Sequence, residues 1–203
     1  MTENLSLKPG DIVPEFEMEA YDPVKDDYTK VSLAANKSQA KWTVLFFYPA
    51  DFTFVCSTEF AALADQQEEF KKQGAELITV SCDTKHVHNA WRKSEGELQN
   101  VKYLMASDTT GKVAKMFGVY DAGSGLALRG TFIIDPKGKL TGSEVNFYNL
   151  GRNIDELMRK LQANIYLSQH GDEVCPARWK HAGDKTLKPS AKIVGKIHEA
   201  LKG

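Results

Sequence analysis

The stretch "KWTVLFFYPADFTFVCSTEF", residues 41–60, contains the transition that decides the fold. Its first ten residues form an apolar run of the kind expected for a strand buried on both faces. After it, apolar residues follow the three-and-four spacing of a helix face: Phe60, Leu63, Ala64, Gln67 and Phe70. Gly74 is placed to end that helix, and "AELITVSCD", residues 75–83, predicts a second strand. Together these segments predict a βαβ unit.

The rest of the chain continues to alternate between strand and helix patterns. The expected elements are a helix at 85–98, an apolar segment at 103–108, a short helix at 111–119, two strands within 126–145 and an amphipathic helix at 153–165. We therefore expect one α/β domain over residues 1–167, with a mixed central sheet flanked by helices. From residue 168 onward the chain is rich in lysine, glycine and proline, so residues 168–203 are predicted to form a C-terminal arm.

Composition excludes several classes of function. With 42% hydrophobic residues, the 203-residue chain is long enough for one domain with a real core. Its 26 basic and 27 acidic residues form no long block of one sign, which argues against nucleic-acid and membrane-surface partners. The start "MTENLSLKPG" lacks the features of a secretory signal, and no apolar run is long enough to span a bilayer. These features predict a soluble, cytoplasmic protein that acts on small partners.

Cys56 lies where the apolar run gives way to the helix. A free cysteine is most often a small buried hydrophobic residue. If Thr53 is the N-cap, however, Cys56 falls in the first helical turn, where backbone N–H groups lack partners and the helix dipole stabilises a thiolate. Pro49 restricts the chain before this turn and has no N–H, so it can shield a pocket. The hydroxyl of Thr53 is expected within reach of whatever Cys56 attacks.

Each kind of reactive cysteine requires particular partner residues. A cysteine hydrolase needs a histidine base, and none of the five histidines stands in a recognisable Cys-His signature. A thioredoxin-like dithiol needs Cys-x-x-Cys, but position 59 is Glu59. What remains is a cysteine that reacts with an oxidant and is resolved by a distant thiol.

Three spaced motifs carry a family resemblance. Pro49-x-x-x-Thr53-x-x-Cys56, followed by "GLALRGTFIIDPKG" and "GDEVCPARWK", resembles the peroxiredoxins over nearly the whole chain. The resemblance is closest to the typical 2-Cys type, as in the bacterial alkyl hydroperoxide reductase C group. It implies a thioredoxin-like fold and a thiol-specific peroxidase that reduces hydrogen peroxide and organic hydroperoxides in antioxidant defence and redox homeostasis.

The same resemblance implies roles for individual residues. Cys56 corresponds to the peroxidatic cysteine, and Cys175 to the resolving cysteine, which in this family comes from the partner subunit and forms an interchain Cys56–Cys175 disulfide. Arg129 corresponds to the arginine that holds thiolate and peroxide together. Glu59 and Arg152 correspond to a carboxylate and an arginine that orient the Arg129 guanidinium.

The residues themselves support part of this assignment. Arg129 interrupts the apolar strand "LALRGTFII", and a buried charge needs a partner. Attack on an O–O bond moves charge toward the far oxygen, so Arg129 and Thr53 are expected to donate hydrogen bonds there. Ser57 departs from the family, in which proline usually follows the peroxidatic cysteine.

Cys82 has a different expectation. Ile78, Val80 and Cys82 alternate onto one face of a predicted strand, which favours a packing role. Cys82, His86 and His88 have a spacing that metal ligands can adopt, but structural zinc usually needs four ligands and nothing completes the set. We expect no metal site.

Partners and cofactors are expected from the resemblance alone. It implies that no cofactor is bound, and that the reductant is a flavin-dependent disulfide reductase subunit or thioredoxin. It also implies a homodimer that assembles into a decamer, a ring of five dimers. The alternative from another class is a redox-regulated chaperone or peroxide-sensing binding protein, in which peroxide turnover would be secondary.

Overall fold

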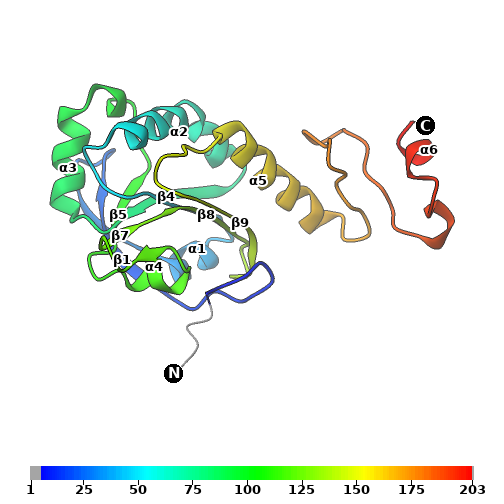
Figure 1. Ribbon diagram of the computed structural model, residues 1–203, viewed down its shortest axis with the longest axis horizontal. Coiled ribbons are helices and arrows are strands. Elements are labelled where there is room, and N and C mark those ends of the chain that lie inside the picture. The colour runs from blue at the N-terminus through cyan, green and yellow to red at the C-terminus, as the bar shows by residue number, and fades with distance from the viewer. Residues whose placement is uncertain (1–5, 203) are drawn as a thin grey trace. The chain divides into compact units, whose positions relative to one another are not determined.

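The computed structural model describes residues 6–202, and the chain divides into two compact units that meet between Ile154 and Asp155. Within the described residues, the first unit contains a seven-stranded sheet in the order β2-β1-β5-β4-β3-β8-β9 (Figure 1). Its strands are β1 Glu17–Asp22, β2 Asp27–Ser32, β3 Trp42–Phe47, β4 Ala75–Ser81, β5 Leu104–Ser107, β8 Arg129–Ile134 and β9 Leu140–Asn146. β3, β4 and β5 are parallel and the other pairings are antiparallel, so the predicted mixed sheet is confirmed.

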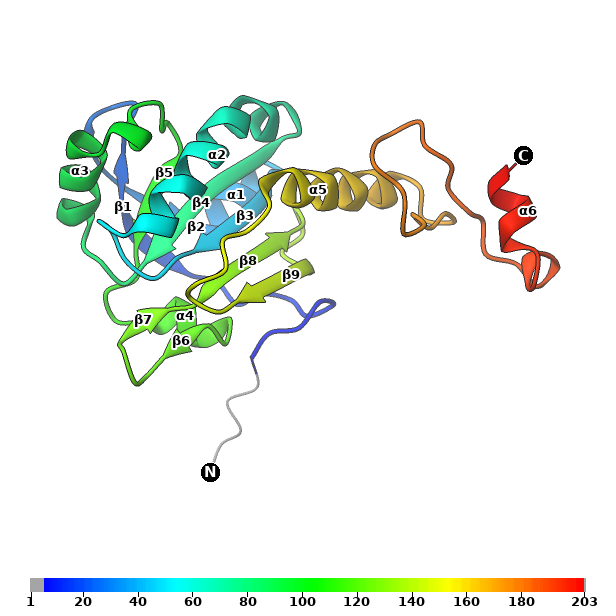
Figure 2. The same ribbon diagram turned by 45° about the horizontal axis from the view of Figure 1, so that its top comes forward.

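Helices cover both faces of this sheet. They are α1 Leu33–Ser38, α2 Phe54–Lys72, α3 Lys85–Ser94 and α4 Lys112–Met116, with a 3-10 turn at Gly96–Leu98 and a small hairpin of β6 Tyr120–Asp121 and β7 Leu126–Ala127. Figure 2 shows α2 and α4 on opposite sides of the sheet. This arrangement is the thioredoxin-like fold that the family resemblance implied.

The β3-α2-β4 unit forms as the sequence of residues 41–83 predicted. β3 and β4 pair in parallel, with Trp42 opposite Ala75. α2 ends at Lys72, and Gly74 follows with a φ of 70°, a conformation that glycine adopts without steric cost. The N-terminus of α2 therefore stands just beyond the end of β3, the edge of an α/β sheet where ligands characteristically bind.

Alternation along β3 divides its side chains between two packing layers. Leu45 and Phe47 belong to the hydrophobic core that also contains Phe117, next to α4. Phe46 and Tyr48 point to the opposite face, where the Tyr48 ring lies 4.8 Å from the ring of Phe60 in α2. Because both layers are filled, every residue of β3 is buried, which explains its continuous apolar sequence.

The N-terminal β1–β2 hairpin and α1 were not predicted from the sequence. β2 lies at the edge of the sheet and has one buried residue among six, so its sequence DYTKVS carries little apolar signal. In β1 the buried positions alternate with exposed glutamates at its start. A strand that buries only one face gives a weaker signal than one buried on both.

The second unit is built on α5, Ile154–Gln169, and ends in a 3-10 turn at Ala191–Ile193 and α6, Ile197–Lys202. Trp179 is buried in it, with its ring 5.9 Å from that of Tyr166, and its carbonyl accepts a hydrogen bond of 3.0 Å from Arg159. The predicted domain boundary at residues 167–168 lies near the end of α5 and stays a prediction.

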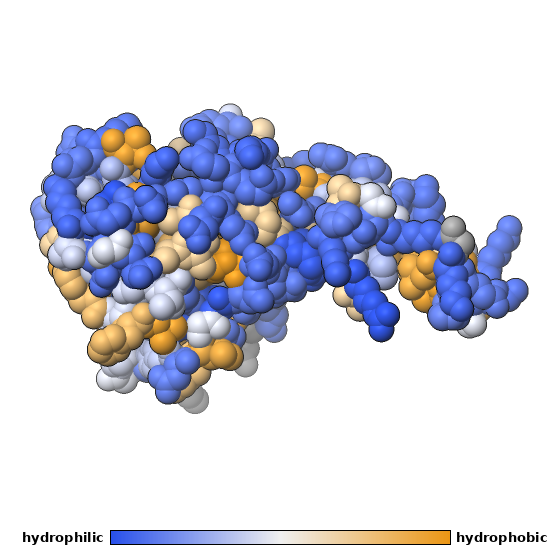
Figure 3. All heavy atoms as spheres, turned by 90° about the horizontal axis from the view of Figure 1, so that it is seen from above, coloured by the Kyte–Doolittle hydropathy of each residue, from blue (hydrophilic) through white to orange (hydrophobic). Residues whose placement is uncertain are grey.

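The surface is mostly hydrophilic in the view of Figure 3, with hydrophobic patches among the polar residues. Phe54, Phe147 and Leu150 are exposed large hydrophobic residues of the first unit. Among the described residues, no helix has the length and apolar character needed to cross a bilayer. Half of the N-terminal stretch on which the absence of a secretory signal was predicted, residues 1–5, lies outside the described residues.

Candidate active site

Cys56 occupies the first turn of α2, directly after the connection from β3. β3 ends at Phe47, and α2 begins at Phe54 after the connecting residues 48–53, which we call the 48–53 loop. Cys56 is fully buried. The predicted position of the thiol at a strand-to-helix junction is therefore the observed one, although burial alone is also what a packing cysteine would show.

Thr53 is the N-cap residue of α2 by its extended backbone, but its side chain makes no capping hydrogen bond. Its hydroxyl instead donates to the carbonyl of Ala50 at 2.8 Å. Because the single hydroxyl proton is used there, the oxygen faces any bound molecule as an acceptor. This differs from the expectation that Thr53 donates to the breaking O–O bond. Pro49 is buried in the same loop.

Ser57, where the family usually has proline, adds hydrogen bonds to this turn. Both its N–H and its hydroxyl donate to the Thr53 carbonyl, at 3.2 and 3.1 Å. A proline at this position would supply neither donor. The first turn of α2 is thus held to Thr53 by two bonds.

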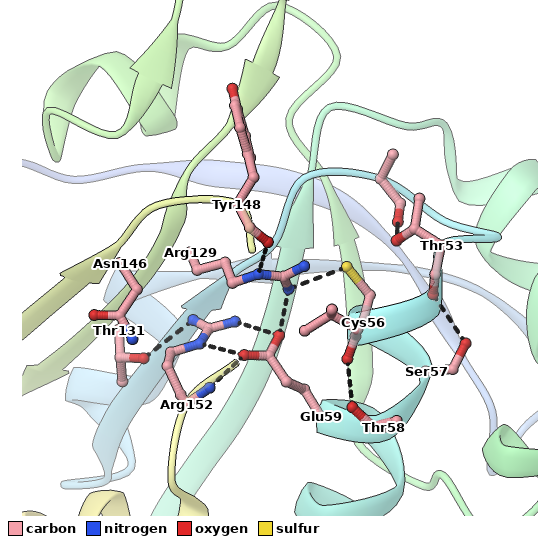
Figure 4. Close-up of polar contacts among 12 residues, drawn as sticks. Thr53, Cys56, Ser57, Thr58, Glu59, Arg129, Thr131, Asn146, Tyr148 and Arg152 are labelled. Atoms are coloured by element: carbon pink, nitrogen blue, oxygen red, sulfur yellow. Dashed lines mark hydrogen bonds and ion pairs between the residues drawn. The ribbon is translucent and has the colours of Figure 1, made fainter. Parts of the chain in front are cut away.

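Arg129 brings a positive charge to the thiol. Thr131 of β8 pairs with Phe46 of the antiparallel β3, so Arg129, two residues earlier, lies level with the end of β3. Its Nη1 donates to the Sγ of Cys56 at 3.2 Å (Figure 4). Its Nε donates to the carbonyl of Tyr148 at 2.7 Å, which fixes the plane of the guanidinium.

Glu59 joins Arg129 to a second arginine. Its Oε2 accepts a hydrogen bond of 2.7 Å from Arg129 Nη1 and one of 2.9 Å from Arg152 Nη2. Its Oε1 accepts from both the backbone N–H and the Nε of Arg152 at 2.9 Å. The side chains of Glu59, Arg129 and Arg152 are each 4% exposed or less, although sequence alone would have placed Glu59 and Arg152 at the surface.

Arg152 is held by contacts with a backbone carbonyl, a hydroxyl, an aromatic ring and the Glu59 carboxylate. Its Nη1 donates to the Gly130 carbonyl and the Thr131 hydroxyl at 3.0 and 3.1 Å, and its guanidinium stacks over the ring of Phe46. Burial lowers the pKa of Arg152, while the hydrogen bonds to Glu59 act in the opposite direction. The fork of Arg152 therefore acts as a rigid support for the Glu59 carboxylate.

The cluster around Cys56 holds more basic than acidic side chains. Two buried guanidiniums face one carboxylate, and a buried charge without a counter-charge is costly. The guanidinium of Arg129 lies beside the Sγ of Cys56. The site thus combines a nucleophilic sulfur, a guanidinium donor beside it and the Thr53 acceptor, a set suited to attack on a polar bond such as O–O.

The other two cysteines have different surroundings. Cys82 lies one residue beyond β4 and is half-buried; burial and the nearby Asp108 and Asp83 carboxylates raise its pKa to about 11. Cys175 belongs to the second unit, also half-buried, and burial raises the pKa of its thiol. Among the described residues, no guanidinium donates a hydrogen bond to either sulfur, although the charge of Arg159 acts to lower the pKa of Cys175.

His86 and His88, which follow Cys82 in the sequence, have separate hydrogen-bond partners. His86 is exposed and contacts the Tyr28 hydroxyl, whereas His88 is buried and contacts Asp51. Within residues 6–202, no group of three or more His, Cys, Asp or Glu side chains is placed to hold a metal ion.

Sequence reasoning missed Tyr148, whose carbonyl orients Arg129 and whose hydroxyl donates to Asp121 at 2.6 Å. It also missed Gly130 and Thr131 as partners of Arg152. Backbone carbonyls carry no residue-type signal, so no pattern in the sequence marks Tyr148 or Gly130. Thr131, a polar residue in the apolar run "TFII", was the one available hint.

The chain is similar to known proteins over most of its length. Residues 9–143 match the model of the AhpC/TSA family. Alkyl hydroperoxide reductase C of Staphylococcus aureus is 42% identical over 193 residues, which cover 95% of this chain and 100% of that protein. Among solved structures, Enterococcus faecalis AhpC aligns with a TM-score of 0.79 at 38% identity, over 85% of this chain and 100% of that one. Plasmodium vivax 2-Cys peroxiredoxin, in its reduced form, aligns with a TM-score of 0.86 at 32% identity, over 94% and 100%.

We expect the Glu59 carboxylate, which two arginines share, to be needed for both stability and reactivity. Glu59→Gln keeps the shape of the side chain but leaves two buried guanidiniums without their carboxylate, so urea unfolding should show a loss of about 3 kcal/mol or more. The reaction of Cys56 with peroxide, followed by stopped-flow, should slow by about tenfold or more because Arg129 loses its support. The control is Glu68→Gln, an exposed glutamate of the same helix. Equal stability of the two variants would contradict the assigned role of Glu59.

Proposed function

The chain belongs to the AhpC/TSA family and is a peroxiredoxin, a thiol-specific peroxidase, and from this premise we propose that Cys56 is the thiol that attacks its peroxide substrates. The observation that carries the proposal is the 3.2 Å contact between the Arg129 guanidinium and the Cys56 Sγ. Arg129 is itself held by Glu59, so the positive charge is fixed before substrate arrives. Cys82 and Cys175 lack such a contact.

The first step follows from this arrangement. The Cys56 thiolate attacks one oxygen of a hydroperoxide, so that an S–O bond forms as the O–O bond breaks. Sulfur is oxidised to the sulfenic acid, and the other oxygen leaves as an alkoxide or hydroxide that takes up a proton. Arg129 lies where it can stabilise the negative charge as it moves from sulfur to the leaving oxygen, and Thr53 can accept a hydrogen bond from the peroxide O–H.

The second step uses Cys175. Its thiolate attacks the Sγ of the sulfenic acid, the S–O bond breaks as the disulfide forms, and the hydroxide that leaves takes up a proton to become water. We assign the peroxidase domain to residues 1–167 and the arm that carries Cys175 to residues 168–203, and we propose that the Cys56–Cys175 disulfide joins two chains. The support is the family membership together with the position of Cys175 in a unit separate from that of Cys56.

Peroxides are the substrates, and a reductase partner returns the disulfide to the dithiol. We propose that this partner is a flavin-dependent disulfide reductase subunit or thioredoxin, and that the chain forms homodimers that assemble into a decamer. Exposed apolar residues support self-association: Phe54 is 93% exposed, Phe147 67% and Leu150 62%.

We place the protein in the cytoplasm, where thiols are kept reduced. The comparisons favour an enzyme over a redox-regulated chaperone or peroxide-sensing binding protein.

The experiment that tests the role of Cys56 is a pair of serine substitutions. Cys56→Ser should abolish peroxide turnover, because a serine hydroxyl is scarcely ionised at neutral pH. Cys82→Ser should retain most of it, because the raised pKa of Cys82 keeps that thiol protonated. Peroxide consumption with a dithiol reductant provides the measurement. Substantial turnover by Cys56→Ser would rule out the proposed nucleophile.

Gel electrophoresis tests the role of Cys175. Wild-type protein treated with one equivalent of peroxide should run as a disulfide-linked dimer on a non-reducing gel. Cys175→Ser should run as a monomer and still consume one peroxide per Cys56. Peptide mapping that finds only an intrachain Cys56–Cys175 bridge would contradict the interchain assignment.

The rate of disulfide formation should depend on pH. Burial raises the pKa of Cys175, so this thiol is mostly protonated at neutral pH, and only its thiolate attacks. Resolution, measured by rapid acid quench and non-reducing gel, should therefore accelerate from about pH 6 to about pH 9. The oxidation of Cys56 in Cys175→Ser serves as the reference for the first step. A resolution rate that stays constant over this range would show that deprotonation of Cys175 does not limit the step.

A further inference from the structure

We propose that Tyr48, Asp51 and His88 form a buried clamp that positions the 48–53 loop, and thereby sets the geometry in which Cys56 meets peroxide. We call these three residues the loop clamp. The inference rests on the proposed function of Cys56 and adds positioning residues to that reaction. The hydrogen bonds of the three residues do not include the Cys56 thiol; they act through the loop that carries Pro49 and Thr53.

The loop clamp is a closed hydrogen-bonded set with almost no exposure to water. Tyr48 and His88 are fully buried, and Asp51 is 6% exposed. The Tyr48 hydroxyl donates to Asp51 Oδ1 at 2.5 Å, and His88 Nδ1 lies 2.7 Å from Asp51 Oδ2. On the other side of the ring, His88 Nε2 lies 3.1 Å from the carbonyl of Ala106.

These contacts use both nitrogens of the His88 ring. The Ala106 carbonyl can only accept, so Nε2 of His88 donates to it. Nδ1 forms the 2.7 Å hydrogen bond with Asp51 Oδ2. Burial raises the pKa of Asp51, while the hydrogen bond from His88 lowers it. A buried polar set in which every member is paired imposes a single geometry.

Residues on or directly after three elements, β3, β4 and α3, form hydrogen bonds with Asp51 of the loop. Tyr48 directly follows β3, and His88 belongs to α3. The backbone N–H of Asp51 donates to Asp83 Oδ2 at 2.9 Å, and Asp83 follows β4 and accepts a second bond from the Ser81 hydroxyl. Asp51 is thus held by its side chain and its backbone at once.

The backbone next to Asp51 shows why such restraint is needed. Phe52 has a φ of 58°, in the left-handed region that bulky residues rarely adopt. A conformation of this kind persists only when its surroundings impose it. Asp51 on one side and the bond from Thr53 to the Ala50 carbonyl on the other supply that restraint. Without the clamp, the loop is free to relax and to move the Thr53 oxygen.

The thiolate depends on a different set of contacts. Cys56 is held in α2 and contacts Arg129, which is fixed by Glu59 and the Tyr148 carbonyl. Loosening the loop should therefore leave the thiolate in place and disturb only the alignment of the peroxide. A positioning role should therefore affect only the alignment of the peroxide. A general loss of structure would affect both that alignment and the Cys56 thiolate.

The experiment compares two reactions of Cys56 in Tyr48→Phe and His88→Asn. Tyr48→Phe keeps the ring and removes the hydroxyl that contacts Asp51 and His88; His88→Asn keeps a donor toward Asp51 and loses the bond to Ala106. The second-order rate constant with hydrogen peroxide, from stopped-flow, should fall about tenfold or more, because misplacement by about 1 Å is enough to cost this much. The rate of alkylation of Cys56 by iodoacetamide, from mass spectrometry of its peptide, should stay within about twofold, because the thiolate persists.

His86→Asn is the matched control, because His86 is exposed and lies two residues before His88 on the same helix. It should change neither rate. A peroxide rate constant in Tyr48→Phe equal to that of wild type would overturn the clamp, and so would a parallel fall of both rates. If Cys56 of the wild-type protein reacts with peroxide no faster than free cysteine does, the proposed function fails and the clamp fails with it. If wild-type Cys56 reacts with peroxide faster than free cysteine and the variants react equally fast, the loop clamp is ruled out and the proposed function of Cys56 stands.

Discussion

The Glu59 carboxylate is the constraint on which the site depends, because two buried guanidiniums must share it. It accepts four hydrogen bonds from Arg129 and Arg152, and all three side chains are almost completely removed from water. An ion pair of this kind survives burial only when its geometry is good and its remaining donors are satisfied. One guanidinium is left in excess, and it donates a hydrogen bond to the Cys56 Sγ. The cluster that satisfies these buried charges therefore also places a positive charge beside the Cys56 sulfur.

The fold assembles this cluster from distant parts of the chain. Cys56 and Glu59 are three residues apart in α2, so both lie on one face of the helix. Arg129 opens β8 beside the end of β3, and Arg152 follows β9 across more than ninety residues from Glu59. The pairing of β3 with β8 brings the arginines to the helix. A single βαβ unit carries Cys56, while the antiparallel strands added to its sheet bring the two arginines.

Features that depend on local sequence could be predicted, whereas features that depend on how distant strands pair could not. Strands buried on both faces, such as β3 and β4, were predictable because a short, continuous apolar run rich in β-branched residues is typical of such strands. The junction that carries Cys56 was predictable because it is local. Burial of Glu59 and Arg152 was not, because it depends on strand register, and only the family resemblance marked these two residues. The β1–β2 hairpin was missed because β2, at the sheet edge, buries little. The direction of the Thr53 hydroxyl depends on a backbone carbonyl, which leaves no mark in the sequence.

The three thiols differ in chemical environment as well as in exposure. Cys56 is fully buried, whereas Cys82 and Cys175 are partly exposed, so access alone would favour the other two. Burial raises the pKa of both partly exposed thiols, which keeps them protonated and weak as nucleophiles. Cys56 has a fixed guanidinium at its sulfur instead. Because its sulfur is buried, however, reaction also requires a defined approach, and the 48–53 loop with the Thr53 oxygen forms part of that approach. In this proposal charge and approach are set by different contacts, the first by Glu59 and the arginines, the second by the loop clamp.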